Sequence, residues 1–115
     1  MRNISNIKGY HAHIYFDETS EPEALALRKL IETEFDVEIG RIHRKAVGPH
    51  PHWSYQLAFP PERFGAVVPF LMLNRGRLDV LVHPRTGDEI RDHFDFAVWL
   101  GEKSDLDRKP LLPKA

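Results

Sequence analysis

The sequence has no cysteine among its 115 residues. This absence excludes disulfide bonds, zinc ribbons, iron–sulfur clusters held by thiolates, and thiol nucleophiles. No apolar run approaches the roughly 20 residues that a membrane-spanning helix needs. The first residues, MRNISNIKGYHAH, also lack the apolar stretch of a signal peptide. We therefore expect a cytoplasmic protein without a membrane partner.

The sequence also lacks an excess of either charge. Its 16 Lys and Arg residues nearly balance 17 Asp and Glu residues, which argues against a nucleic-acid partner. A chain of this length and ordinary composition is typical of one globular domain. We expect residues 1–101 to form that domain and residues 102–115, which are rich in charge and proline, to form a C-terminal tail.

Histidine, by contrast, is abundant, with seven copies. In the absence of thiols, imidazole and carboxylate are the strong metal ligands that remain. A small domain has a single core, and buried polar groups in it are costly unless they serve a function. The positions of the histidines in the fold therefore decide whether they form a site.

Hydrophobic periodicity predicts four strands, at residues 9–17, 37–45, 53–59 and 78–83, and three helices, at residues 19–35, 60–75 and 87–100. Pro69 predicts a kink in the second helix or a later start for it. Two prolines keep the segment 46–52, AVGPHPH, as a loop. This order predicts an α+β fold, a ferredoxin-like βαββαβ sandwich with an additional C-terminal helix.

In such a sandwich the helices cover one face of the sheet, and the first strand lies between the third and the fourth. Period-two alternation turns the apolar side chains of residues 10–16 toward the helices, and His11 and His13 toward the open face. His52 leads into the third strand and His83 ends the fourth. These four histidines can converge on one ion, and imidazole suits iron, zinc, copper or nickel.

The same histidines also have plainer interpretations. His50 and His52 can simply be exposed in their loop, and His43 lies among basic residues that are typical of a solvated face. His93, next to Asp92, can be an exposed helical residue or an acid/base. Several aromatic residues can either pack in the core or shape a pocket beside the site: Tyr15, Trp53 and Tyr55.

Residues 41–85 carry seven basic side chains and two acidic ones. This segment contains both His52 and His83. It indicates an anionic small substrate held by an arginine, or an ordinary solvated surface.

Three stretches carry a family resemblance: YHAHIYFD (10–17), GPHPHWSYQLAF (48–59) and LVHPRTGDEIRDHFDFAVWLG (81–101). Together they resemble the DOPA 4,5-dioxygenase family, from about Lys8 to Gly101. The resemblance implies a ferredoxin-like fold, a homodimer, and extradiol cleavage of DOPA or a related catechol. It also implies that non-haem Fe(II) and O₂ take part in the reaction.

The resemblance directs attention to His11, His13, His52, His83 and His93. We expect His11, His52 and His83 to bind the metal, and His13 or His93 to act as the acid/base. The expected substrate-binding residues are Arg41, Arg77 or Arg85 for a carboxylate, together with Tyr55 and His50.

No acidic residue stands within the histidine set, so a mainly histidine site is the simplest interpretation. The acidic candidates are Asp79 in a strand, and Glu89 and Asp92 in the last helix. A histidine site leaves zinc or another divalent metal as alternatives to Fe(II).

Two other function classes remain open from the sequence. A dimeric ferredoxin-like module could bind a metal or ligand without catalysis, as a sensor or carrier. An assembly domain could pack its open sheet face on a second subunit, although a face rich in histidine makes a poor hydrophobic interface.

Overall fold

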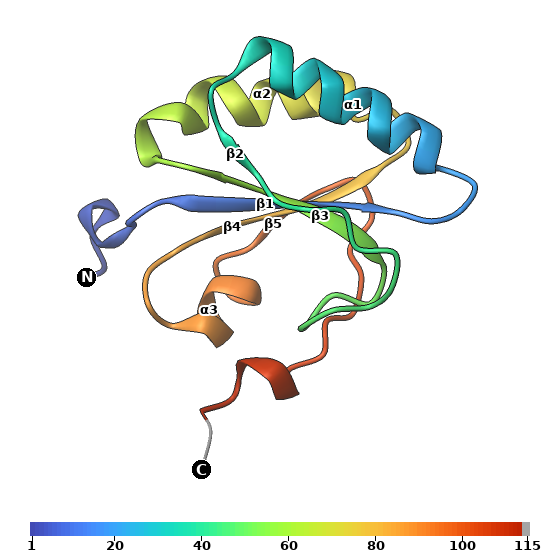
Figure 1. The fold of residues 1–115 in the computed structure, drawn as a ribbon. Helices are drawn as coiled ribbons and strands as arrows, with labels where there is room; N and C mark the ends of the chain where they lie inside the picture. The colour runs from blue at the N-terminus through green and yellow to red at the C-terminus, as the bar shows by residue number, and fades with distance from the viewer. Residues whose placement is uncertain (114–115) are drawn as a thin grey trace.

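The computed structural model describes residues 1–113 as one layer of helices on an antiparallel sheet (Figure 1). The strands are β1 (Tyr10–Phe16), β2 (Glu38–Ile39), β3 (Trp53–Phe59), β4 (Asp79–Pro84) and β5 (Val98–Leu100). The helices are α1 (Glu21–Glu34), α2 (Phe64–Asn74) and α3 (Glu89–His93), with short 3₁₀ turns at Ile4–Asn6, Pro61–Arg63 and Lys109–Leu111. Among the described helices, none has the length and apolar character to cross a membrane.

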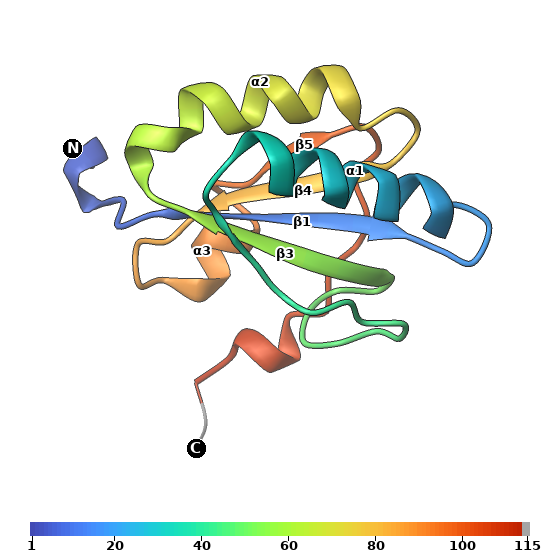
Figure 2. The ribbon, with the colours of Figure 1, turned by 45° about the horizontal axis from the view of Figure 1, so that its top comes forward.

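The sheet order is β2-β3-β1-β4-β5, which places β1 at the centre. Helices α1 and α2 cover one face, while α3 and the C-terminal segment lie on the other (Figures 1 and 2). This arrangement confirms the ferredoxin-like α+β fold, extended at one edge by a fifth strand.

The core lies between the sheet and the two long helices. Ala12, Ile14 and Phe16 of β1 belong to it, as the alternation predicted, together with side chains of α1, α2, β3 and β4. His11 and His13 consequently face away from α1 and α2. Apolar burial of alternate residues thus determines which face of β1 carries the histidines.

The structure corrects two predicted elements. The strand expected at 37–45 is only Glu38–Ile39, followed by an isolated bridge between His43 and Ser54. The helix expected at 87–100 is wrong beyond its first turns: α3 ends at His93, and Val98–Leu100 pairs with β4. Pairing with β4 satisfies the backbone N–H and C=O groups of residues 98–100. This tertiary contact overrides the helical pattern of the sequence.

The helix expected at 60–75 begins later than predicted from its pattern, which is one of the two alternatives that Pro69 raised. The 3₁₀ turn at Pro61–Arg63 precedes the helix, which starts at Phe64 and continues through Pro69. The helix expected at 19–35 is confirmed with slightly tighter bounds.

The C-terminal segment runs along the site face of the sheet. The backbone N–H of Asp107 donates to the carbonyl of Pro49 at 3.0 Å. The guanidinium of Arg108 lies 4.0 Å from the ring centroid of Phe94, just after α3. The segment therefore contacts both the proline-rich loop and α3, the two elements that carry His50 and His93.

Candidate metal centre

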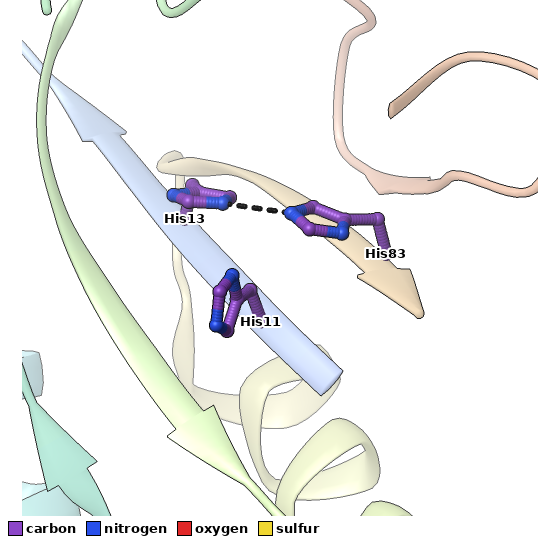
Figure 3. A group of neighbouring side chains, drawn as sticks. All are labelled: His11, His13 and His83. Carbon is purple, nitrogen blue, oxygen red and sulfur yellow. Dashed lines mark hydrogen bonds between the residues drawn. The ribbon is translucent and has the colours of Figure 1, made fainter. Parts of the chain in front are cut away.

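The strand register brings two histidines directly opposite each other. His11 of β1 pairs with His83 of β4, and His13 follows two residues along β1 on the same face. Their rings lie close together: the centroid of His11 is 5.8 Å from that of His13 and 5.2 Å from that of His83 (Figure 3). Neighbouring strands thus gather three imidazoles without help from any loop.

Two further histidines close over this group. The ring of His50, from the loop before β3, lies 4.0 Å from the ring of His13. The ring of His93, at the end of α3, lies 4.0 Å from the ring of His83. Five histidines therefore form one continuous cluster, within which two sets each bring three potential ligand atoms within 4.8 Å of one another: His11, His13 and His83, and His13, His50 and His93.

The cluster is largely shielded from water. Four of its members are buried, with exposed fractions between 1% and 8%: His13, His50, His83 and His93. His11 is partly exposed and marks the accessible side of the cluster. A ligand that arrives from solvent would therefore meet the cluster first at His11.

Burial favours the neutral form of four of these imidazoles. Desolvation is the main cause that lowers the pKa of His11 and His50 to about 4 and that of His83 to about 3. The pKa of His13 falls well below its ordinary value, first through desolvation and then through neighbouring histidines. Neutral imidazole is the form that binds a metal.

Backbone carbonyls set the tautomers of two histidines. Nδ1–H of His83 donates to the carbonyl of Pro84 at 2.8 Å, and Nδ1–H of His93 donates to the carbonyl of Glu89 at 2.7 Å. Because a carbonyl can only accept, Nδ1 of each ring carries a proton, and in the neutral form of the ring Nε2 has a free lone pair. This is the arrangement by which proteins orient histidine ligands.

The central pair lies near the spacing of two ligands on one ion. Nε2 of His13 and Nε2 of His83 are 3.0 Å apart and form a hydrogen bond (Figure 3). Two nitrogens about 2.1 Å from one tetrahedral ion are separated by about 3.4 Å, so the two rings need to move only slightly to bind a common ion. The residues present therefore fit a divalent metal ion.

Tyr15 joins the cluster through a contact that the sequence did not reveal. Its hydroxyl lies 2.6 Å from Nδ1 of His50, and the side chain is 4% exposed. Burial raises the pKa of Tyr15, so the phenol stays protonated. It orients His50, whereas sequence analysis left Tyr15 as either a packing residue or part of a pocket wall.

The structure does not bring His52 into either three-histidine set. Its side chain is exposed, and Nε2 lies 3.0 Å from Oγ of Ser104. Its ring approaches that of Tyr15, at 5.5 Å between centroids. His50, two residues earlier in the same loop, occupies the place in the cluster that the sequence assigned to His52.

Tyr55 lies on the other face of the sheet. It is fully buried in the core, and its hydroxyl donates to the carbonyl of Ala24 in α1 at 2.8 Å. This placement separates Tyr55 from the cluster and makes it a packing residue.

Of the three candidate arginines, Arg85 is the one next to the cluster. It follows β4, and its positive charge helps to lower the pKa of His11. Arg77 instead donates to the carbonyl of Thr19 and the carboxylate of Glu23. Arg41 is exposed and follows β2, beyond β3 from the cluster.

The acidic candidates take different places. Asp79 accepts from the backbone N–H of Glu102 near the end of β5. Glu89 is exposed, and only its backbone carbonyl reaches His93. Asp92 is fully buried and accepts hydrogen bonds from Thr86.

Comparisons with known proteins place the chain in a family. The model of the Dopa 4,5-dioxygenase family matches residues 10–109. A DOPA 4,5-dioxygenase from Amanita muscaria is 41% identical over 106 residues, covering 84% of this chain and 46% of that protein. An uncharacterized 21.2 kDa protein from Botryotinia fuckeliana is 40% identical over 116 residues, covering 90% of this chain and 63% of that protein.

A solved structure agrees with the fold. The crystal structure of a "putative dioxygenase" from Nostoc punctiforme PCC 73102 superimposes with a TM-score of 0.95 at 45% identity, covering 96% of each chain. The chain therefore belongs to the Dopa 4,5-dioxygenase family. It spans less than two thirds of the length of the two curated relatives.

Proposed function

We propose that this protein is a dioxygenase that opens the ring of a catechol beside its two hydroxyl groups. In this reaction the ring carbon–carbon bond next to the diol breaks, and both atoms of O₂ enter a muconic semialdehyde-type product. The observation that carries the proposal is the convergence of five histidines on one sheet face of a member of this family.

Within the cluster, His11, His13 and His83 would hold the metal ion, and we propose Fe(II). This set contains the Nε2 pair at 3.0 Å and includes the partly exposed His11. This set differs from the one predicted from the sequence because His13 takes the place of His52. A bound Fe(II) would supply redox chemistry with O₂ and lower the pKa of the catechol hydroxyls that it binds.

His93 is suited to handle protons in this site. Its bond to the carbonyl of Glu89 leaves Nε2 as a base, and its ring lies 4.0 Å from that of His83. It can take a proton from a catechol hydroxyl and return it to the opened product. Its burial keeps competing water away from that nitrogen.

Substrate would enter on the side of His11, where Arg85 stands. A guanidinium binds a carboxylate through paired, charge-assisted hydrogen bonds. A catechol with a carboxylate-bearing side chain, such as DOPA, could then place its ring toward the histidines and its carboxylate toward Arg85. This assignment selects one of the three arginines that the sequence left open.

Oxygen uptake tests the proposed activity. The chain is reconstituted anaerobically with Fe(II), mixed with DOPA or a 4-substituted catechol, and then exposed to O₂ in an electrode cell. We expect one O₂ to be consumed for each catechol. Protein that retains Fe(II) and binds the catechol but consumes no O₂ would instead be a non-catalytic binding module.

A matched pair of variants tests the carboxylate contact. Arg85→Leu removes a charge-assisted contact, so KM for DOPA should rise roughly 10- to 100-fold, whereas KM for 4-methylcatechol should stay unchanged. Arg41→Leu removes the same charge away from the cluster and should alter neither value. Equal effects of Arg85→Leu on both substrates would disprove this assignment.

A further inference from the structure

Asp92 is unusual among the acidic residues of this chain. Within residues 1–113 it is the one carboxylate that is buried, with an exposed fraction of 0%. None of the ion pairs found in these residues includes it; the adjacent Arg91 pairs with Asp88 and Asp95. An interior carboxylate without a cationic partner is costly, so its presence requires a physical reason.

The hydrogen bonds of Asp92 engage both of its carboxylate oxygens with Thr86. Oδ1 accepts from the hydroxyl of Thr86 at 2.6 Å, and Oδ2 accepts from the backbone N–H of Thr86 at 2.9 Å. The hydroxyl of Thr86 itself accepts from the N–H of Asp88, at 3.4 Å. Both oxygens are thus acceptors, and the 2.6 Å contact is typical of a hydroxyl bound to a charged oxygen.

These bonds connect the two elements that carry His83 and His93. Thr86 lies in the turn after β4, which ends just beyond His83, and Asp92 immediately precedes His93 in α3. The Asp92–Thr86 contact therefore holds α3 against the end of β4. It fixes the position from which His93 approaches His83.

The carboxylate also acts on the cluster through its charge. Burial, and then the positive charge of Arg85, lower the pKa of His11, whereas the negative charge of Asp92 acts in the opposite direction. Asp92 takes part in none of the ion pairs found in residues 1–113, so its carboxylate has no cationic partner there. A divalent cation among the histidines would supply a balancing positive charge.

We propose that Asp92 is a positioning and charge-balancing residue for a divalent cation held by the histidine cluster. The inference rests on the proposed metal centre. Asp92 does not coordinate the ion; it lowers the free energy of the cation-bound state through its charge and, with Thr86, keeps His93 in place. Interactions of this kind around histidine ligands typically change metal affinity by about 10- to 100-fold.

Cation affinity of the metal-free chain measures this effect directly. Zn²⁺, and Fe²⁺ under anaerobic conditions, are titrated against a chromophoric chelator, and Kd is compared with that of Asp92→Asn. The amide has the shape of the carboxylate without its charge, so Kd should rise about 10- to 100-fold. Asp95→Asn removes an exposed carboxylate two residues after α3 and should change Kd less than about twofold.

Thermal unfolding without metal separates charge balance from a merely structural role. Because Asp92→Asn replaces an unpaired buried charge by a neutral amide, the metal-free variant should unfold at the same temperature as the parent or higher. A structural role alone would lower that temperature and leave Kd unchanged, which would overturn the inference.

Substitutions of Thr86 give an independent measurement if Asp92→Asn does not fold. Thr86→Val removes the hydroxyl donor while keeping the charge of Asp92. Because Thr86 lies in the turn just after the proposed ligand His83, its loss of the Asp92 bond should raise Kd about tenfold. Thr86→Ser keeps the hydroxyl and should restore the affinity. Equal Kd values for the valine and serine variants would refute the positioning role.

Failure of the inference differs from failure of the proposed function. If the parent chain binds neither cation, the metal centre and the role of Asp92 both fall. If the parent binds a cation and folded Asp92→Asn binds it equally well, the metal centre stands and only the role of Asp92 is refuted.

Discussion

The exchange of His52 for His13 in the metal set leads to a sharp test. His83→Ala removes a ring whose Nε2 lies 3.0 Å from that of His13, at the centre of the cluster. His52→Ala removes an exposed ring from the same face of the chain, outside either three-histidine set. We expect the first variant to lose metal binding and the second to keep it.

The size of the effect follows from ligand-linked stability. A metal present at 100 times its Kd stabilises the folded state by about 2.7 kcal/mol. For a domain of this size that corresponds to a rise in Tm of roughly 10 °C. His83→Ala should abolish this rise, whereas His52→Ala should retain nearly all of it.

The assay is differential scanning fluorimetry with and without Fe²⁺ or Zn²⁺. Each variant is compared with its own metal-free form, since His83→Ala also leaves the Nε2–H of His13 without its acceptor, at a cost of about 1–3 kcal/mol. Metal content after dialysis gives a second measurement. A full Tm rise in His83→Ala would refute the geometry proposed for the centre, because His83 belongs to both the proposed and the predicted set. Loss of the rise in His52→Ala would restore His52 as a ligand, as predicted from the sequence.

Three further predictions concern residues whose roles the structure decides. Tyr55→Phe removes the buried bond to the carbonyl of Ala24, so urea unfolding should show a loss of about 1 kcal/mol; unchanged metal affinity would confirm that Tyr55 lies away from the site. The pKa of Asp17 is lowered to about 2, mainly by its hydrogen bond from the Thr19 hydroxyl, so its stabilising contribution is complete above pH 3.8 and disappears as pH falls through 2. Asp17→Asn should flatten that part of an acid-unfolding curve, and an unchanged curve would contradict the assignment. Gly101 has a φ of +89° and a neighbouring Asp79 carboxylate in the space of a Cβ, so Gly101→Ala should lower the free energy of unfolding by about 1–3 kcal/mol in the same urea assay, and no loss would contradict the strain argument.

Much of the fold could be predicted because it depends on local pattern. The alternation in Tyr10–Phe16 predicts a strand and assigns His11 and His13 to the face away from the helices, which the core confirms. The fold class follows from the order of such elements. The helix predicted at 87–100 is wrong at residues 98–100 because their pairing with β4 is a tertiary contact, and no local pattern contains it.

The candidate site, too, could be predicted from the sequence only in part. Sequence by itself determined that the metal ligands had to be imidazole or carboxylate, and that two histidines of β1 share a face, because side chains alternate along a strand. Tertiary structure decided the rest. Strand register set His83 opposite His11, and the conformation of the proline-rich loop turned His50 rather than His52 inward. Docking of α3 against β4 then brought His93 to the cluster and buried Asp92 beside it. Such choices depend on contacts between residues far apart in the chain, so the sequence of each segment does not contain them.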